Sequence, residues 1–302
     1  MIIYKNLSIK KNHKNSVVAI GNFDGLHLGH QKVLNQARLK AKKENLKFGV
    51  ITFEPIPNMF FNKNIKYNRI NSAEQKIYYL NKLKLDFLII INFNESFSNI
   101  SAEHFISKIL VAKLKSKYIF VSQNFRFGKK RLGNTNTLKI FEKKNLYKTI
   151  ITIPYRKNKK IISSSLIRKK IYEGNVVEVK KLLGRPWIIK GEVVKGEQRG
   201  KKIGFPTCNI KWDSYVLPKL GVYSVQVETK NFKKKGIANL GYRPTFNGKT
   251  LLLEVNIFGI KVNLYKKILK VSFIKFIRPE KKFKNINELK KQIKKDITKI
   301  KK

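Results

Sequence analysis

The sequence is poor in cysteine, in acidic side chains and in long apolar runs. Its single cysteine, Cys208, excludes an internal disulfide and a zinc site built from clustered cysteines. The longest apolar runs, such as residues 87–91, have the length of a strand and fall far short of a membrane span. The first residues lack the apolar core and small-residue cleavage site of a signal peptide. We therefore expect a cytoplasmic protein without a membrane partner.

The shortage of acid gives the chain an extreme positive charge. Only 18 Asp and Glu stand against 67 Lys and Arg, for a formal net charge of +49. Such a charge first suggests nucleic-acid binding, because a basic surface attracts phosphate backbones. However, only ten of these residues are arginines, whose forked guanidinium suits phosphate and base recognition. The lysines are also scattered along the chain, so we favour a bias towards AT-rich codons and expect no nucleic-acid partner.

The length of 302 residues and a hydrophobic content of 42% indicate about two globular domains. In residues 1–183, strand and helix patterns alternate, which predicts a doubly wound α/β domain. In such sheets ligands bind at the carboxyl ends of strands, near the switch in strand order. The expected strands cover 17–20, 48–53, 87–93 and 118–122, and the expected helices cover 31–43, 73–83 and 101–110.

A glycine-punctuated turn follows the first of these strands and leads into a helix. Free N–H groups and the positive end of the helix dipole meet at such a turn, which suits a phosphate. Two imidazoles three residues apart face this point, and a glycine between them allows close approach of a ligand. The alternative is a helix that contains two histidines by coincidence, but the chain has only 4 His. The candidate residues are Gly21, Phe23, Asp24, Gly25, His27, Gly29 and His30.

Two further segments of this half carry candidate ligand groups. Asn124, Phe125, Arg126 and Arg131 lie in a loop after the strand 118–122, and they suit a planar ring and a phosphate together. The alternative there is a basic surface loop. Ser163, Ser164, Ser165 and Arg168 begin a helix, where hydroxyls bind phosphate oxygens or merely cap N–H groups. The segment at Ser101 resembles an N-terminal cap, so His104 is expected to be structural.

Residues 184–302 have short β-rich segments separated by turn signals, which predicts a small antiparallel barrel. The expected strands cover 187–194, 221–229, 236–240, 251–258 and 268–276, and apolar residues at helical spacing follow from residue 286.

Polar residues in this second half form two candidate sites. A glycine-rich stretch containing Gly196 and Gly204 precedes Thr207 and Asn209, which share one face of a strand and could share a Mg²⁺ ion. A hairpin with ordinary polar residues is the alternative. Glu254 is a carboxylate inside an apolar strand, and a carboxylate in that position needs a partner or a function.

Five motifs together resemble those of the bacterial bifunctional riboflavin kinases/FMN adenylyltransferases. The string G-N-F-D-G-L-H-L-G-H at 21–30 is similar to the family's adenylyltransferase turn, and segments 124–133 and 162–168 follow in family order. Segment 196–209 is similar to G-x-x-x-G-R-x-L-G-F-P-T-x-N, and the strand around Glu254 follows the stretch that contains Arg243. The H-x-G-H string alone is shared with class I aminoacyl-tRNA synthetases, but the chain has no loop like K-M-S-K-S.

The resemblance implies a nucleotidyltransferase domain over 1–183 and a six-stranded riboflavin-kinase barrel with a terminal helix over 184–302. It implies that riboflavin and ATP give FMN, and that FMN and ATP give FAD and pyrophosphate, with Mg²⁺ accompanying ATP. The histidines would contact the phosphates, and the serines and Arg168 would hold the triphosphate. Residues 124–131 would form the flavin and nucleotide pocket of this half. In the kinase half, Gly196, Gly204 and Arg243 would bind nucleotide and flavin. Thr207 and Asn209 would hold Mg-ATP, and Glu254 would be the catalytic base.

The sequence departs from the family pattern at several positions. Ser165 replaces a usual threonine and Lys201 a usual arginine. Near the flavin side of the barrel, polar or acidic residues of the family are replaced by Asn256, Gly259, Asn263 and Lys266. A protein that retains only one of the two activities therefore remains an alternative, and a basic nucleic-acid-binding protein is a more distant one.

Overall fold

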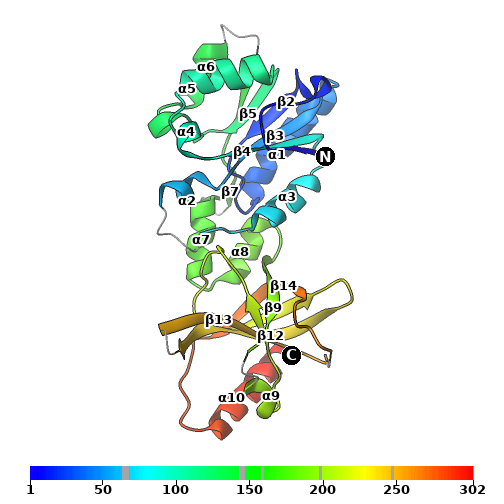
Figure 1. Cartoon of the computed structure of the whole chain (residues 1–302), viewed down its shortest axis with the longest axis vertical. Helices are drawn as coiled ribbons and strands as arrows, with labels where there is room; N and C mark the ends of the chain where they lie inside the picture. The colour runs from blue at the N-terminus through cyan, green and yellow to red at the C-terminus, as the bar shows by residue number, and fades with distance from the viewer. Residues whose placement is uncertain are drawn as a thin grey trace. The chain divides into compact units, whose positions relative to one another are not determined.

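The computed structural model describes residues 1–62, 68–142, 147–157, 160–196, 199–245, 248–260 and 262–301. The chain forms two compact units (Figure 1). The first comprises Met1–Lys66 and Ala73–Ser164, and the second comprises Tyr67–Ser72 and Ser165–Lys302. The domain boundary predicted between residues 183 and 184 falls inside the second unit and stays a prediction.

The first unit contains a parallel six-stranded sheet with the order β1-β4-β3-β2-β5-β6. From β2 the chain moves outward through β3 to β4, and then it returns to the other side of β2 to form β5 and β6. The switch in strand order therefore lies between β2 and β5, and this arrangement confirms the predicted doubly wound fold. The strands are β1 (Ile2–Tyr4), β2 (Val17–Ile20), β3 (Phe48–Glu54), β4 (Phe87–Asn92), β5 (Tyr118–Ser122) and β6 (Lys148–Thr152).

Helices cover both faces of this sheet, as the alternation along β2 shows. Val17 and Ala19 belong to a core cluster that includes apolar residues of α1 and α3. Val18 and Ile20 belong to a second cluster, formed with residues 105–114 and Leu138 of α6. A strand that is buried on both faces reads as a continuous apolar run, which explains the pattern at 17–20. The helices are α1 (Leu28–Lys43), α2 (Pro57–Phe61), α3 (Ala73–Asn81), α4 (Glu95–Ser98), α5 (Ala102–His104) and α6 (Thr135–Glu142), and short 3-10 turns cover Lys11–His13 and Lys129–Arg131.

The helix expected at 101–110 differs from a regular α-helix. After the short α5, residues Phe105–Lys113 form a π-helix (η2). The apolar pattern does not distinguish the two forms, because both bury a stripe of side chains against the sheet. The cap was predicted correctly, since the Ser101 hydroxyl accepts the backbone N–H of His104 at 3.0 Å.

The second unit contains a closed antiparallel barrel with the order β10-β13-β12-β11-β14-β9. This confirms the six-stranded barrel, and the sixth strand is β10, which lies at the end of the glycine-rich stretch. Trp187, Tyr223 and Phe273 are fully buried and their rings lie in contact. The strands are β9 (Trp187–Val194), β10 (Cys208–Lys211), β11 (Gly221–Glu228), β12 (Lys233–Thr245), β13 (Gly248–Ile257) and β14 (Ile268–Arg278), and the helices are α7 (Ser164–Tyr172), α8 (Val176–Leu183), α9 (Arg199–Lys202) and α10 (Ile286–Lys301). A small hairpin of the first unit, β7 (Arg156–Lys157) and β8 (Lys160–Ile161), precedes α7 in the chain.

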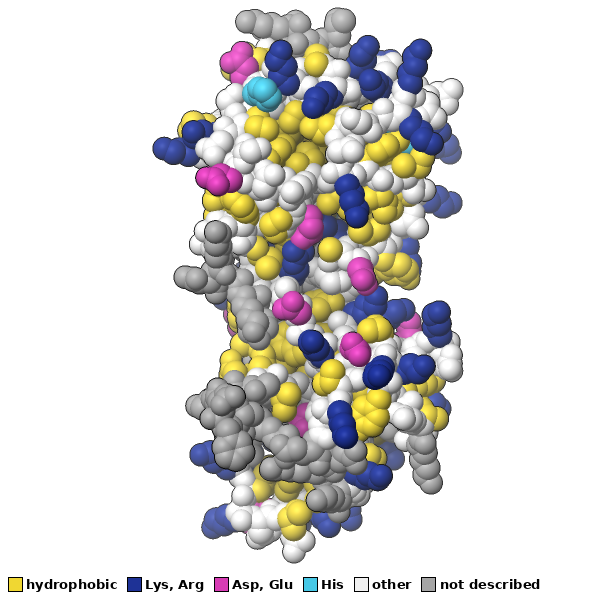
Figure 2. Space-filling view, viewed as in Figure 1, with side chains coloured by type: hydrophobic (Ala, Val, Ile, Leu, Met, Phe, Trp, Pro, Cys, Tyr) yellow, Lys and Arg dark blue, Asp and Glu magenta, His cyan; other side chains and the backbone are white. Residues whose placement is uncertain are grey.

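Basic side chains are dispersed over the face drawn in Figure 2, where they alternate with apolar, uncharged and acidic ones. They form no continuous stripe on that face. In the described ranges, no helix combines the length and the apolar character needed to cross a membrane.

Candidate functional site

The turn after β2 is held in an unusual backbone conformation at the predicted switch point. Phe23, Gly25 and Leu26 all have positive φ, at 48°, 85° and 39°. Such angles are strained for phenylalanine and leucine, and both of these side chains are only 2% exposed. Burial in the core therefore keeps the turn in a fixed shape. Asp24 is also buried, and the ring of Phe23 lies against Gly21.

The two histidines lie together at the start of α1. His27 is the N-cap of the helix, and its Nδ1 accepts the backbone N–H of His30 at 3.3 Å. Because Nδ1 is the acceptor, a neutral His27 carries its proton on Nε2 and can donate it to an anion. The rings stack with centroids 3.6 Å apart, and Phe23 meets His30 edge-on. The predicted pair thus exists, and His27 has a capping role that the sequence pattern did not reveal.

The serine segment meets this turn, as expected for two parts of one site. The Ser164 hydroxyl donates to the backbone oxygen of Asp24 at 2.9 Å. A Cβ added at Gly29 would lie 3.1 Å from the His27 ring and 3.3 Å from the backbone oxygen of Ile162, so glycine permits this close approach. Ser163 is half-buried and Ser165 is exposed.

Arg168 belongs to the second unit. Its Nε donates to the backbone oxygen of Asn68 at 2.8 Å, within that unit. A role beside the histidines therefore stays a prediction.

The loop after β5 begins at the other side of the switch point. The Phe125 and Phe127 rings stack at 5.3 Å and pack on the core of the sheet, and Phe127 exchanges two backbone hydrogen bonds with Gly133. The core therefore uses much of the aromatic surface that the sequence suggested for a ligand. Asn124, Arg126 and Arg131 have exposed side chains that remain accessible to one.

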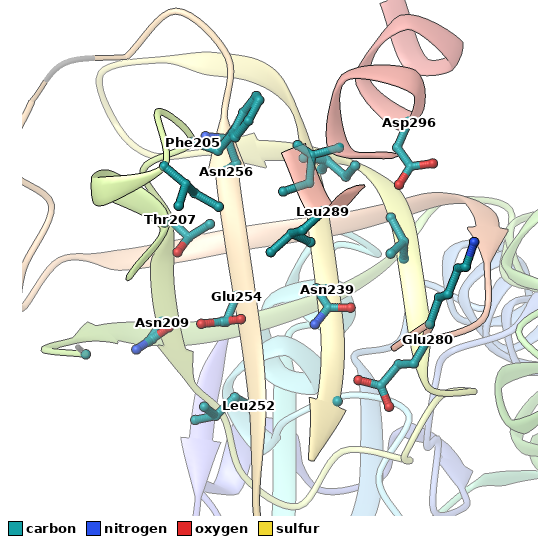
Figure 3. A pocket seen from close by; sticks show the side chains of 18 of the residues that line it. Phe205, Thr207, Asn209, Asn239, Leu252, Glu254, Asn256, Glu280, Leu289 and Asp296 are labelled. Carbon is teal, nitrogen blue, oxygen red and sulfur yellow. The ribbon is translucent and has the colours of Figure 1, made fainter. Parts of the chain in front are cut away.

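A cavity of about 510 Å³ lies in the second unit, at the barrel. Three polar side chains line it in a row across neighbouring strands (Figure 3). Glu254 on β13 is paired in register with Asn209 on β10 and with Asn239 on β12. A half-buried carboxylate thus lies between two amides. Thr207 lines the same cavity, two residues before Asn209.

Asn239 was not identified from the sequence. It is one polar residue in the alternating strand β12, and only the pairing of β12 with β13 shows that it faces Glu254. The neighbouring residues Ala238 and Leu240 are fully buried on the opposite face of β12. This alternation of apolar and polar residues is the sequence signal from which the register of β12 could have been predicted.

Glycines bring the loop after β9 close to this row. A Cβ at Gly196 would overlap the amide nitrogen of Asn209, and a Cβ at Gly200 would overlap the backbone oxygen of Phe205. Gly204 has a φ of +86°, which favours glycine. Arg243 belongs to β12, but its side chain lies outside the described part of the structure.

The departures from the family pattern have structural roles here. Asn256 lines the cavity and donates from Nδ2 to the backbone oxygen of Pro206 at 2.6 Å, which connects β13 to the Thr207 segment. Gly259 has a φ of +70° in the turn after β13, and the Asn263 side chain accepts the N–H of Tyr265. None of these contacts removes a group from the row around Glu254.

The donor set suits magnesium bound together with a nucleotide. Within the described ranges, no group of three or more His, Cys, Asp or Glu side chains could hold a metal alone. The Thr207 hydroxyl and the Asn209 amide oxygen are hard ligands that complement phosphate oxygens around Mg²⁺.

Comparison with known proteins assigns both units to one family. The FAD synthetase family profile matches residues 9–166, and the riboflavin kinase family profile matches residues 183–302. The bifunctional riboflavin kinase/FMN adenylyltransferase of Buchnera aphidicola from Schizaphis graminum is 43% identical, over 98% of this chain and 96% of its own. The chain belongs to the bifunctional riboflavin kinase/FMN adenylyltransferase family.

Other relatives agree over nearly the full length. The protein of the same name from Haemophilus influenzae is 39% identical over 93% of this chain and 91% of its own. A crystal structure from Streptococcus pneumoniae, described as a macrolide-efflux protein, superposes with a TM-score of 0.87 and 31% identity over 98% of this chain and 97% of that one.

Proposed function

We propose that this chain makes FAD in two ATP-dependent steps, the first in residues 184–302 and the second in residues 1–183. Riboflavin kinase and FMN adenylyltransferase activities follow from the two matching profiles and from the names of the relatives. The residue roles below are supported by the geometry of the two sites. The row Asn209–Glu254–Asn239 in the barrel cavity is the observation that carries the kinase assignment.

In the kinase step, Glu254 takes the proton of the 5′-hydroxyl of riboflavin. The hydroxyl oxygen then bonds to the γ-phosphorus of ATP, the bond to the β–γ bridging oxygen breaks, and ADP leaves. A positioned base contributes roughly 10² to 10⁴ in rate. Thr207 and Asn209 would hold Mg²⁺, which neutralises phosphate charge when bound.

In the adenylyl step, a phosphate oxygen of FMN bonds to the α-phosphorus of ATP in line, and pyrophosphate leaves. No covalent enzyme intermediate is needed, because positioning and charge stabilisation supply the rate. His27, His30 and the free N–H groups of α1 contact the phosphates. Ser164, Ser163, Ser165 and Arg168 hold the departing pyrophosphate, and Asn124, Arg126 and Arg131 contact flavin or nucleotide.

Chromatography of riboflavin, FMN and FAD after incubation with Mg-ATP tests both steps. We expect Glu254→Ala to abolish FMN formation while FAD still forms from supplied FMN. We expect His30→Ala to show the reverse. Glu192→Ala and His104→Ala change exposed side chains outside both sites and serve as controls. Loss of both activities from either site variant in folded protein would contradict this separation.

A protein with adenylyltransferase activity alone is the second candidate. It is retained because Asn256, Gly259 and Asn263 depart from the family pattern, and absence of FMN from riboflavin in the same assay would establish it. We place the enzyme in the cytoplasm, without a nucleic-acid partner, on the basis of its sequence and the dispersed Lys and Arg side chains on the face drawn in Figure 2.

A further inference from the structure

Lys76 on α3 is a buried charge outside the residues discussed so far. Its side chain is 4% exposed, and in the described part of the chain no other lysine or arginine is buried. Burial of an ammonium group is costly unless it is paired and hydrogen-bonded. A buried lysine that differs in this way from the other described lysines indicates a specific role.

The contacts of Lys76 lie at the carboxyl end of β3. Its Nζ lies 3.3 Å from the Thr52 hydroxyl, 3.2 Å from the backbone oxygen of Phe53 and 3.5 Å from a carboxylate oxygen of Glu54. Three oxygens thus surround the ammonium group. Since an ammonium group only donates, the Thr52 oxygen accepts from it.

Thr52 connects Lys76 to the turn after β2. Its side chain is fully buried, and its hydroxyl donates to the backbone oxygen of Asn22 at 3.1 Å. One residue before Asn22 and Thr52 in each segment, the Gly21 N–H donates to the backbone oxygen of Ile51 at 3.1 Å. Beyond the end of β2, therefore, a side-chain hydrogen bond continues the attachment of the turn to β3. The chain of contacts runs from Lys76 through Thr52 to Asn22, five residues before His27.

We propose that Lys76 and Thr52 are positioning residues for adenylyl transfer. The lysine orients and polarises the Thr52 hydroxyl, and the hydroxyl holds the turn in the shape that places the two histidines and the N-terminus of α1. This inference rests on the proposed function of the turn. A structural alternative is that Lys76 only compensates the charge of Glu54 and stabilises the fold.

Thr52→Val and Thr52→Ser form the matched pair that tests this, because valine keeps the shape and serine keeps the hydroxyl. Full-length variants and Lys76→Met are assayed for FAD formation from FMN, and FMN plus FAD formed from riboflavin reports the kinase. We expect Thr52→Val and Lys76→Met to lower kcat for FAD formation about tenfold or more, with the KM for ATP changed less than about threefold. The kinase rate serves as an internal control and should stay within about twofold of wild type, and Thr52→Ser should restore FAD formation to about half of wild type or better.

The double variant Thr52→Val/Lys76→Met should lose no more than the more impaired single variant, because both changes break one chain of contacts. The inference is overturned if Thr52→Val forms FAD at the wild-type rate, if Thr52→Ser is no better than Thr52→Val, or if both activities fall together. If Lys76→Met does not fold, the comparison of Thr52→Val with Thr52→Ser tests the inference by itself. A wild-type protein that forms no FAD from FMN would refute the proposed function itself, whereas an active wild type matched by Thr52→Val would refute only the positioning role.

Discussion

At the scale of single residues, Cys208 shows how burial in the barrel lowers the reactivity of a side chain. It lies on β10 between Thr207 and Asn209, and burial raises the pKa of its thiol. A higher pKa leaves less thiolate at a given pH, and the thiolate is the reactive form. The chain's only cysteine is therefore expected to be unreactive in the native state.

We expect native protein at pH 8 to react with iodoacetamide at least about threefold more slowly than the same protein in urea. Mass spectrometry of the alkylated chain over time measures both rates. The native rate should rise as pH increases towards the raised pKa. Equal rates in the folded and unfolded protein would show that the barrel does not protect this thiol.

Gly196 provides a second prediction at this scale. A methyl group there would overlap the amide of Asn209, so Gly196→Ala must displace Asn209 or the loop. We expect kcat/KM of the kinase to fall about 10²-fold, while FAD formation from FMN is unchanged. Gly259→Ala is the control, because its Cβ would meet nothing within 4 Å and carries only the strain of a positive φ. Similar kinase rates in the two variants would contradict the close approach.

At the scale of elements, helix α10 is attached to the barrel by an ion pair between a buried carboxylate and a half-buried arginine. Asp296 is 1% exposed and accepts from Arg278 Nε on β14 at 2.8 Å and from Gln292 at 2.9 Å. The sequence showed an apolar stripe on this helix but did not reveal that Asp296 faces inward. Both side chains of the pair also line the barrel cavity, so this attachment fixes one wall of that cavity.

We expect Asp296→Ala to lower the free energy of unfolding by about 3 kcal/mol, because it leaves the Arg278 charge without its carboxylate. Urea titration followed by circular dichroism measures the change. Lys295→Ala, an exposed neighbour, should change stability by less than about 0.5 kcal/mol. A loss below about 1 kcal/mol for Asp296→Ala would mean that the pair contributes little.

Local sequence patterns predicted most of the helices and strands. The elements that they missed or mistook were missed for physical reasons. The strands at 48–53 and 187–194 were predicted within a residue or two, because apolar runs and alternation report burial directly. The edge strand β1 was not predicted, since its three residues are mostly exposed and it is defined by pairing with β4. The π-helix at Phe105–Lys113 was expected as an α-helix, because its apolar stripe has the same appearance in sequence.

At the scale of the whole molecule, the net charge of +49 should produce only weak and unspecific attraction to nucleic acid. Attraction of this kind depends on the release of counterions, so it falls steeply with salt. We expect the anisotropy of a labelled DNA duplex to show binding that weakens by about 10³ between roughly 50 and 200 mM salt, whatever the duplex sequence. Binding that resists salt and prefers one sequence would contradict the expectation of no nucleic-acid partner.

The sequence by itself determined the order of the elements, and it predicted the residues of both candidate sites. The histidine turn, the serine segment and Glu254 were all identified from local spacing, because turns, caps and periodicity depend on neighbouring residues. Only the tertiary structure decided which of these groups meet. It paired Asn239 with Glu254 across two strands, and it brought Ser164 into a hydrogen bond with Asp24 and Lys76 into one with Thr52. Strand register and sheet order depend on contacts between distant parts of the chain, and a single sequence does not record those contacts.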